Sequence, residues 1–458
     1  MKKLDMTQML NRIRRFLEQG QEKKALTLLI SLLPADKADI FAELSPDMQQ
    51  QLLPGIGPED TAEILEGLDS DEAADVAQQV DSTVLAQILD EMEPDEAADL
   101  LGDLSKDLRL STLADMESRE DVLPLLRYPD DSAGGLMTSD YNVFPDNTPI
   151  GEVFRAIRAQ MHHGEEIPYV YAVDEQGRLT GVAPLVSLIR THPAQPLRAI
   201  AETEFVSADP WDDQEVVVQL VTRYDLLALP VVDARGQLLG VITADDAMAA
   251  QQEEASEDIY RGAGIVSLGG QEAARSDLLV RGPIWRVWLV RIPFLVITLV
   301  GGMLAGGVIG VYEEALQSIT VLAFFIPVIM GMGGNAGAQS DEIFIRAYAL
   351  GQIDLNKFHV YLLKEVVVGI GMGVVLGIPT GLITAIWQGN TQLGLVVGLA
   401  MGATLSLSTL VGYVIPYILV RLGMDPTAGA SPFITMIKDI SGLFIYFSLA
   451  NLILGNML

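Results

Sequence analysis

The C-terminal part of the chain consists of long apolar stretches that alternate with short polar turns. Five stretches are long enough to cross a bilayer, since a spanning helix needs about 20 residues. They lie near residues 287–311, 316–340, 360–387, 393–420 and 433–455. The N-terminal segment has no continuous apolar core, which argues against a signal peptide. The pattern predicts a polar N-terminal region followed by five membrane-spanning helices.

Basic residues fall on one side of these stretches. They precede the first, separate the second from the third, and separate the fourth from the fifth: Arg281, Arg286, Arg346, Lys357 and Arg421. The turns on the other side, residues 312–314 and 388–391, have none. Because basic loops stay in the cytoplasm, we expect a multi-pass protein of the inner (plasma) membrane. Its N-terminus would be cytoplasmic and its C-terminus outside.

The first 128 residues have apolar positions three and four apart, the spacing of amphipathic helices. Residues 64–75 recur as residues 88–99, and this offset of 24 residues predicts a small α-solenoid. Each copy carries acidic residues one helical turn apart, such as Asp95 and Asp99. An acidic first turn also stabilises a helix by capping, so the accumulation of acids matters more than any single pair.

Residues 129–248 change to short β-rich runs between helices. Residues 169–182 and 229–242 each predict a strand, a turn with Asp and Gly, and a second strand. The next segment, 249–280, is acidic and then basic, which is typical of a charged connecting helix; a plain linker is the alternative. We therefore predict a multi-domain membrane protein: an acidic α-helical N-domain (1–128), a tandem α/β pair (129–248), a connecting helix (249–280) and a five-span domain (281–458).

The charge of the chain is strongly negative and unevenly distributed. The formal net charge is −32, and residues 281–458 hold as many acids as bases, so the imbalance lies in residues 1–280. This argues against a nucleic-acid partner and suits divalent cations. The chain has no cysteine, which excludes disulfides and thiolate sites. An enzyme is disfavoured because no nucleophile–base pair, Walker motif or catalytic metal triad is present.

One carboxylate, Asp439, falls about two turns inside the fifth span. At that depth a carboxylate is costly unless it faces water, a cation or an ionic partner. Lys438 comes directly before it and points about 100° away around the helix. We expect this lysine to extend to the membrane surface or to pair with Asp341 or Glu342.

The second span is rich in glycine, with four glycines in residues 331–337, and the amides of Asn335 and Gln339 lie one turn apart. Exposed carbonyls and amides of this kind suit a water-lined path. Close helix packing is the alternative explanation for the glycines.

The duplicated α/β segment resembles a tandem pair of CBS domains. The whole arrangement of solenoid, CBS pair, connecting helix and five spans resembles the MgtE family of magnesium channels. The most specific matches are the segments 128–138, 333–340, 425–426 and 439–446. The resemblance implies a homodimer, joined through its CBS and transmembrane domains in the lipid bilayer. It also implies one pore on the symmetry axis, a "plug" helix below the pore, and cytosolic Mg²⁺ sites that hold it shut.

The resemblance also assigns roles to single residues. Asp439 would be the pore carboxylate for hydrated Mg²⁺, with the amides of Asn335 and Gln339 beside it. The regulatory Mg²⁺ ligands fall on the second CBS repeat, the plug helix and one backbone carbonyl: Asp213, Glu215, Asp225, Asp246, Glu254, Glu257, Asp258 and Gly135. The solenoid offers Asp90, Asp95 and Asp99 as candidates. One family acid falls on Ala249, so at least one regulatory site should be weaker.

Nucleotide binding is a further implication of the CBS resemblance. Thr243, followed three residues later by Asp246, resembles a ribose-contacting pattern, and Tyr169 matches the ATP site of the family. The Arg–Asp pair of that site falls on Val186 and Ser187. This departure counts against ATP as a cofactor.

The predicted function is a Mg²⁺-selective channel that imports Mg²⁺ down the membrane potential and closes when cytosolic Mg²⁺ binds the acidic region. Two alternatives remain open at this point. A Na⁺- or H⁺-coupled exchanger of divalent cations would also need Asp439 but would depend on a second gradient. A membrane sensor without transport would rest on the CBS pair alone.

Overall fold

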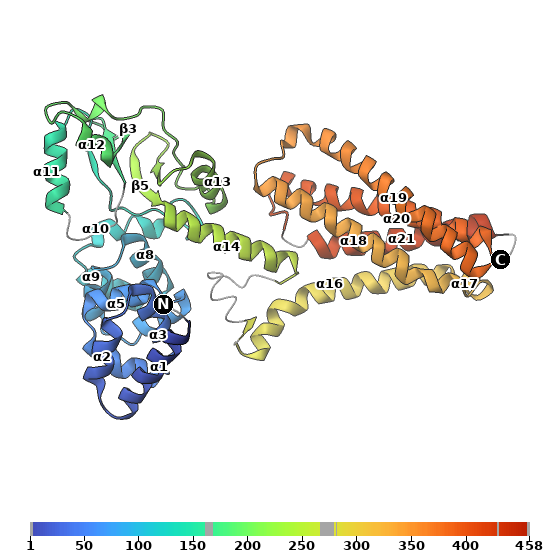
Figure 1. Cartoon of the computed structure of the whole chain (residues 1–458), viewed down its shortest axis with the longest axis horizontal. Helices are drawn as coiled ribbons and strands as arrows, with labels where there is room; N and C mark the ends of the chain where they lie inside the picture. Colours follow the sequence, from blue (N-terminus) through green and yellow to red (C-terminus); the bar gives the residue numbers. More distant parts are fainter. Residues whose placement is uncertain (1–2, 161–167, 266–278, 281, 428–429, 456–458) are drawn as a thin grey trace. The chain divides into compact units, whose positions relative to one another are not determined.

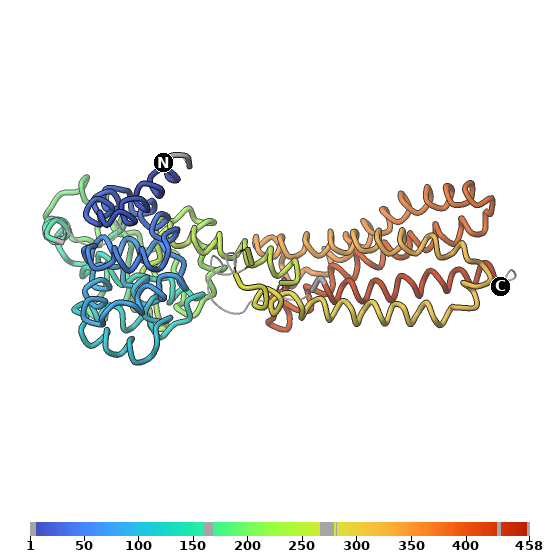
Figure 2. Tube along the Cα trace, turned by 90° about the horizontal axis from the view of Figure 1, so that it is seen from below, coloured from blue at the N-terminus to red at the C-terminus, as the bar shows by residue number. Residues whose placement is uncertain are grey.

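A computed structural model describes residues 3–160, 168–265, 279–280, 282–427 and 430–455. These residues form two compact units that divide after Glu254 in helix α14. The first unit holds the solenoid and the α/β pair, and the second holds the end of α14 and the long apolar helices (Figures 1 and 2). Residues 266–278 of the predicted connecting segment lie outside the described residues.

The solenoid consists of short antiparallel helices. Their bounds are α1 (Lys3–Glu18), α2 (Glu22–Ile30), α3 (Pro34–Ala42), α4 (Pro46–Leu52), α5 (Pro58–Glu66), α6 (Ser70–Ala77), α7 (Ser82–Leu89), α8 (Pro94–Asp103), α9 (Lys106–Asp115) and α10 (Arg119–Val122). The 24-residue offset seen in the sequence recurs in the starts of α3, α5, α7 and α9. Proline at the first helical position sets several of these starts. The predicted solenoid is confirmed.

The α/β pair consists of two similar repeats. The first contains β1 (Val143–Pro145), α11 (Ile150–Gln160), β2 (Tyr169–Val173), β3 (Leu179–Pro184) and α12 (Leu185–Arg190). The second contains α13 (Gln214–Tyr224), β4 (Ala228–Val232), β5 (Leu238–Thr243) and α14 (Ala244–Gly262). In each repeat the last two strands pair antiparallel with an irregularity at the same place. The pairing sets Tyr169 opposite Pro184 and Ala228 opposite Thr243.

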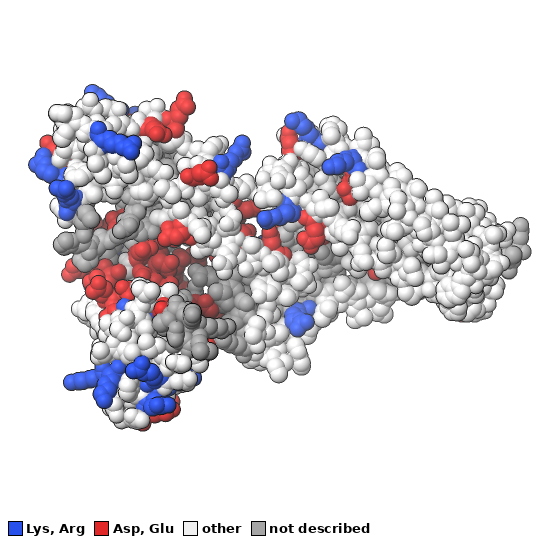
Figure 3. All heavy atoms as spheres, viewed as in Figure 1, with Lys and Arg blue, Asp and Glu red and all other residues white. Residues whose placement is uncertain are grey.

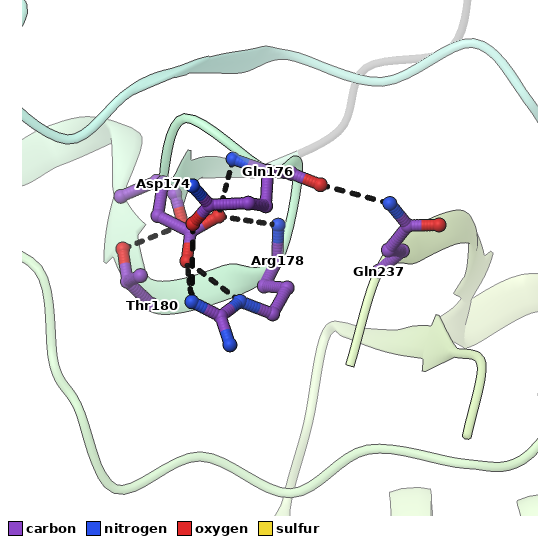
Figure 4. A network of polar contacts seen from close by, with 6 residues as sticks. Asp174, Gln176, Arg178, Thr180 and Gln237 are labelled. Carbon is purple, nitrogen blue, oxygen red and sulfur yellow. Dashed lines mark hydrogen bonds and ion pairs between the residues drawn. The ribbon is translucent and has the colours of Figure 1, made fainter. Parts of the chain in front are cut away.

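The turns of the two repeats bind each other, which ties the pair together (Figure 4). Asp174 accepts hydrogen bonds from the backbone N–H groups of Gln176 and Arg178, and Gly177 takes the left-handed conformation with φ 76°. The side chain of Gln237, in the second repeat, donates to the carbonyl of Gln176 at 2.8 Å. The Asp and Gly of each predicted turn therefore stabilise its shape.

The second unit contains five helices that are long and apolar enough to cross a membrane among the described residues. The long helices are α16 (Ile284–Val311), α18 (Leu322–Ala349), α19 (Phe358–Gln388), α20 (Thr391–Arg421) and α21 (Ala430–Leu454). A short helix, α17 (Glu313–Ser318), precedes α18. The second span therefore starts later than residue 316 and continues past residue 340. The number of spans is as predicted.

Helices α19 and α20 approach each other along facing glycines. A Cβ atom on Gly377 would lie 2.6 Å from the carbonyl oxygen of Gly398, and one on Gly381 would lie 2.7 Å from that of Gly394. Small residues allow this close contact between membrane helices. These glycines of the third and fourth spans thus serve helix packing.

Candidate functional site

Asp439 lies on α21, in the span where the sequence predicts it. Its side chain is half-buried. None of the hydrogen bonds and ion pairs among the described residues involves its carboxylate. A carboxylate inside a membrane helix that forms no hydrogen bond or ion pair is left to bind water or a cation.

The glycine-rich segment of α18 is continuously helical. Its carbonyls therefore accept hydrogen bonds within the helix. A Cβ atom on Gly333 would lie 2.9 Å from the Thr404 side chain, and one on Gly412 would lie 2.3 Å from the carbonyl oxygen of Gly337. These glycines let α18 pack closely against α20.

Another face of α18 is polar and exposed within the unit. Asn335, Gln339 and Glu342 are all exposed on it, spaced three or four residues apart. Neither amide forms a hydrogen bond to another described residue. Polar groups that face hydrocarbon are unfavourable, so this face suits water or a second copy of the chain. Both predicted amides thus lie on this exposed polar face.

The charged residues that accompany this region differ in their surroundings. Asp341 is 1% exposed, and Glu342 is exposed near the end of α14. Glu342 forms no ion pair with Lys438 among the described residues. The ammonium of Lys438 instead lies against Gly334 of α18.

In the first unit, acidic side chains of the solenoid meet those of the second CBS-like repeat (Figure 3). The cluster consists of Glu66, Glu93, Asp95, Glu96, Asp99, Asp103, Asp130, Asp245 and Asp246. We call these residues the acidic interface. Of the candidate ligands that the sequence suggested, Asp95, Asp99 and Asp246 belong to it.

Burial and mutual repulsion raise the pKa of the carboxyls at the acidic interface. Burial is the main cause, and it raises the pKa of Glu93 and of Asp95 to about 7. Burial, with the charge of Asp95 next, raises the pKa of Glu96 to about 8. Burial, followed by the charge of Asp130, raises the pKa of Asp99 to about 9. These carboxyls need a counter-charge when they are ionised.

Asp95 is the most enclosed member of the acidic interface. Its side chain is 6% exposed, and its Oδ1 atom has no hydrogen-bond partner in the part of the chain that the structure describes. A buried carboxylate oxygen without a partner is costly, and a cation would satisfy it. Among the described residues, however, no three acidic or histidine side chains converge closely enough to form a complete metal site.

Several predicted regulatory residues also have local structural roles. Asp213 caps α13 by accepting from the N–H of Glu215 at 2.9 Å, and Asp225 ends that helix with φ 52°. Glu254 accepts a hydrogen bond from Gln214 at 2.7 Å. In the solenoid, Asp90 accepts from the backbone of Glu117 and Ser118. Asp90 is thus a helix-end partner and lies outside the acidic interface.

Gly135 lies in a tight turn beside α13. A Cβ atom there would lie 2.3 Å from the carbonyl oxygen of Pro129 and 2.8 Å from Asp130. Only glycine fits this position. The conformation brings residues 130 and 131 next to the start of α13, where Gln214 donates its N–H to the Asp131 carbonyl at 2.9 Å.

In the second unit, the end of α14 contacts the loop before α21. Arg261 forms ion pairs with Asp425 and with Glu257, the latter at 2.5 Å. Burial, with the charge of Asp425 next, raises the pKa of Asp258 to about 6. We call Glu257, Asp258, Arg261 and Asp425 the plug contact. In the plug contact, the two predicted plug acids, Glu257 and Asp258, lie close to Arg261 and Asp425.

Comparison with known proteins identifies the family. Family models match in three parts: the MgtE intracellular N domain over residues 10–85 and 78–131, the CBS domain over residues 133–191 and 197–253, and the MgtE divalent cation transporter over residues 326–449. The chain is 36% identical to the magnesium transporter MgtE of Thermus thermophilus over 346 residues, 76% of this chain and 75% of that protein. The chain belongs to the MgtE family of magnesium transporters.

Other relatives agree. The magnesium transporter MgtE of Bacillus subtilis is 31% identical over 75% of this chain and 75% of that protein. The soluble part of a magnesium transporter matches with a TM-score of 0.50 at 28% identity, covering 55% of this chain and 99% of that structure. The cytosolic domain of the Mg²⁺ channel MgtE in complex with ATP matches with a TM-score of 0.50 at 31% identity, covering 52% of this chain and 99% of that structure. The predicted family, fold class and multi-pass membrane character are confirmed.

The nucleotide residues predicted in this MgtE-family chain lie in the CBS pair. Tyr169 begins β2, and Thr243 ends β5, where its hydroxyl donates to the Asp246 carboxylate. The matching strand registers place Pro184 where the second repeat has Thr243, and Ser187 where it has Asp246. The strand registers thus agree with the sequence alignment, in which the first repeat has Ser187 at the position of the acid Asp246.

Sequence reasoning missed Glu66, Glu93 and Glu96 at the acidic interface and Arg261 at the plug contact. The 24-residue repeat placed the acids of both copies on helix faces, but it gave no sign of which copy faces the CBS pair. Arg261 follows Glu257 at a spacing of four, a signal that an ion pair within α14 was possible. Nothing local indicated its second partner, Asp425.

Proposed function

We propose that this MgtE-family protein is a Mg²⁺-selective channel with Asp439 in its pore. The observation that carries the proposal is the Asp439 carboxylate, which lies inside a span and forms no hydrogen bond or ion pair among the described residues. The exposed amide face of α18 supports it. Both features suit a path for a hydrated cation.

The mechanism follows from the chemistry of the ion. Mg²⁺ gives up its water reluctantly, so selective sites hold it through waters and one or two carboxylates. Two Asp439 side chains facing each other across the axis of a homodimer would supply such a site. The amides of Asn335 and Gln339 would hydrogen-bond to the water shell. The membrane potential drives entry with about 2.3 kcal/mol per charge per 100 mV.

We further propose that cytosolic Mg²⁺ closes the pore through the acidic interface and the plug contact. The unpartnered Asp95 oxygen and the raised pKa of its neighbours support the first site. Bound cations would hold the acids together and stabilise a closed state. Without bound cations, repulsion among the carboxylates favours an open state. Such a population shift needs several ions that bind the closed state more tightly than the open state. The remaining predicted ligands, Gly135, Asp213, Glu215, Asp225 and Glu254, lie in the same unit as the acidic interface.

ATP enters only as a second regulatory ligand. A similar cytosolic domain was solved with ATP, and Tyr169 and Thr243 remain the candidate contacts here. The missing acid at Ser187 weakens that case. We therefore expect weaker nucleotide binding than a complete pair of ribose-contacting residues would give.

The test is Mg²⁺ flux into proteoliposomes under an imposed inside-negative potential, with internal Mg²⁺ kept low. We expect potential-driven flux in the unmodified protein and its loss in Asp439→Ala, with Asp354→Ala, an exposed acid in the loop before α19, as the matched control. Flux that requires a Na⁺ or H⁺ gradient would instead establish the exchanger. Absence of flux under every gradient would favour the sensor.

A further inference from the structure

Lys438 lies inside a membrane helix and follows the surface of α18. Its Cδ atom is 3.7 Å from the position that a Cβ atom of Gly337 would occupy. Its Nζ atom is 2.9 Å from the corresponding position at Gly334. The two glycines leave room for the side chain, which thus lies along the same helix that carries the exposed amides.

The direction of this side chain places the charge deep in the span. Gly334 is near the midpoint of the 28-residue helix α18, and Gly337 is nearer to its C-terminal end. The side chain therefore runs toward the middle of the span. A lysine that reached for the membrane surface would run the opposite way, so the first expectation for Lys438 is not met. Its ammonium lies at the level of Asn335.

The ammonium forms no ion pair or hydrogen bond among the described residues. Asp439, the next residue, lies about 100° away around the helix, yet it is close enough for its charge to act on Lys438. A charge at this depth is costly in hydrocarbon and becomes tolerable where it faces water or a hydrated ion. Gly334 is next to the exposed residues Gly331, Asn335 and Ala338 on the surface of α18, so a water-filled path along that side of the helix would provide this environment.

We propose that Lys438 is a specificity-determining residue of the cation path, a fixed positive charge that weakens divalent-cation binding at Asp439. The proposal rests on the proposed channel function. Repulsion from one ammonium is twice as large for Mg²⁺ as for a monovalent cation at the same distance. Because conduction needs sites that also release the ion, this repulsion raises the Mg²⁺ concentration for half-maximal flux and speeds release.

The experiment is potential-driven Mg²⁺ flux measured against external Mg²⁺ concentration in proteoliposomes. Lys438→Gln should lower the half-saturating Mg²⁺ concentration by about tenfold, the effect expected from removing a nearby like charge. Its maximal flux should fall as release slows. Lys438→Arg should behave like the unmodified protein. Lys364→Gln, which removes an exposed lysine from α19, is the matched control and should leave the curve unchanged.

A second form of the test does not depend on the folding of a charge-removing variant. The chain has no cysteine, so Lys438→Cys introduces a single thiol. On the assembled protein, a methanethiosulfonate reagent that carries an ammonium group should restore the high half-saturating concentration. A reagent that carries a sulfonate group should lower it further. Both should react, since the path is water-filled.

The outcomes separate this proposal from the channel function. If flux depends on Asp439 but Lys438→Gln and the two reagents leave the half-saturating concentration unchanged, the role of Lys438 is wrong and the channel stands. If the unmodified protein has no Asp439-dependent flux, both proposals are wrong. A thiol at position 438 that reacts with neither reagent would also contradict the inferred position of Lys438.

Discussion

At the scale of single residues, this protein depends on positions where the backbone leaves no room for a side chain. Gly135 is one of them, because a Cβ atom would collide with the backbone of Pro129 and Asp130, which cannot move as a side chain can. Gly102, in α8, has nothing within 4 Å of the same position. A side chain would therefore have no room at Gly135 but ample room at Gly102, although both glycines lie in the first unit.

Gly135→Ala should therefore destabilise the protein, and Gly102→Ala should not. We expect a loss of about 1–3 kcal/mol for Gly135→Ala, the usual effect of overpacking. For Gly102→Ala, greater helix propensity predicts a gain of about 1 kcal/mol. Thermal unfolding of the full-length protein in detergent measures both. Equal unfolding temperatures for the two variants would contradict the tight turn at Gly135.

At the scale of elements, the plug contact joins the end of α14 to the loop before α21. Arg261 supplies positive charge to both Glu257 and Asp425. Thr427 fixes the Asp425 carboxylate by donating its N–H and its hydroxyl, each at 2.7 Å. The arginine thus stabilises this contact even when no cation is bound.

Arg261→Gln should increase Mg²⁺ flux at low internal Mg²⁺. The ion pair is partly exposed, so we expect an effect of about 1 kcal/mol, or roughly a fivefold change in flux. Flux into proteoliposomes without internal Mg²⁺ measures it. Arg155→Gln is the control, since it removes an exposed arginine that pairs with Glu152 on α11. Unchanged flux in Arg261→Gln would show that the plug contact does not hold the closed state.

At the scale of the whole molecule, the acidic interface makes stability depend on pH and on divalent cations. The pKa of each carboxyl from Glu93 to Asp99 is raised in the folded protein, to values from about 7 to about 9. The folded state then binds more protons than the unfolded state, so stability falls as the pH rises. Most of this loss comes between the usual carboxyl pKa and pH 9. A divalent cation bound at the acidic interface would take the place of these protons.

Without divalent cations, the unfolding temperature of the full-length protein should therefore decrease as the pH is raised from about 6 to about 9. Added Mg²⁺ should raise it more at the higher pH. Asp95→Asn should reduce both dependences, because it removes the charge from the most enclosed site. Calorimetry in detergent measures all three. An unfolding temperature that increases with pH over this range would contradict the assignment.

The sequence by itself determined the elements of this protein. The apolar lengths fixed the five spans, the 24-residue repeat fixed the solenoid, and the paired Asp–Gly turns fixed the two CBS repeats. All of these are local patterns, which neighbouring residues carry. Asp439 could also be singled out, because a carboxylate inside an apolar stretch is conspicuous without knowledge of its contacts.

Only the tertiary structure decided which charged residues meet. It brought Glu66, Glu93 and Glu96 to Asp246, joined Arg261 to Asp425, and directed Lys438 along α18 toward the middle of the span. These partners are far apart in the chain, and their helices show the same amphipathic pattern whichever neighbour they contact. The meeting of two surfaces depends on how whole helices pack, and no local pattern encodes that packing.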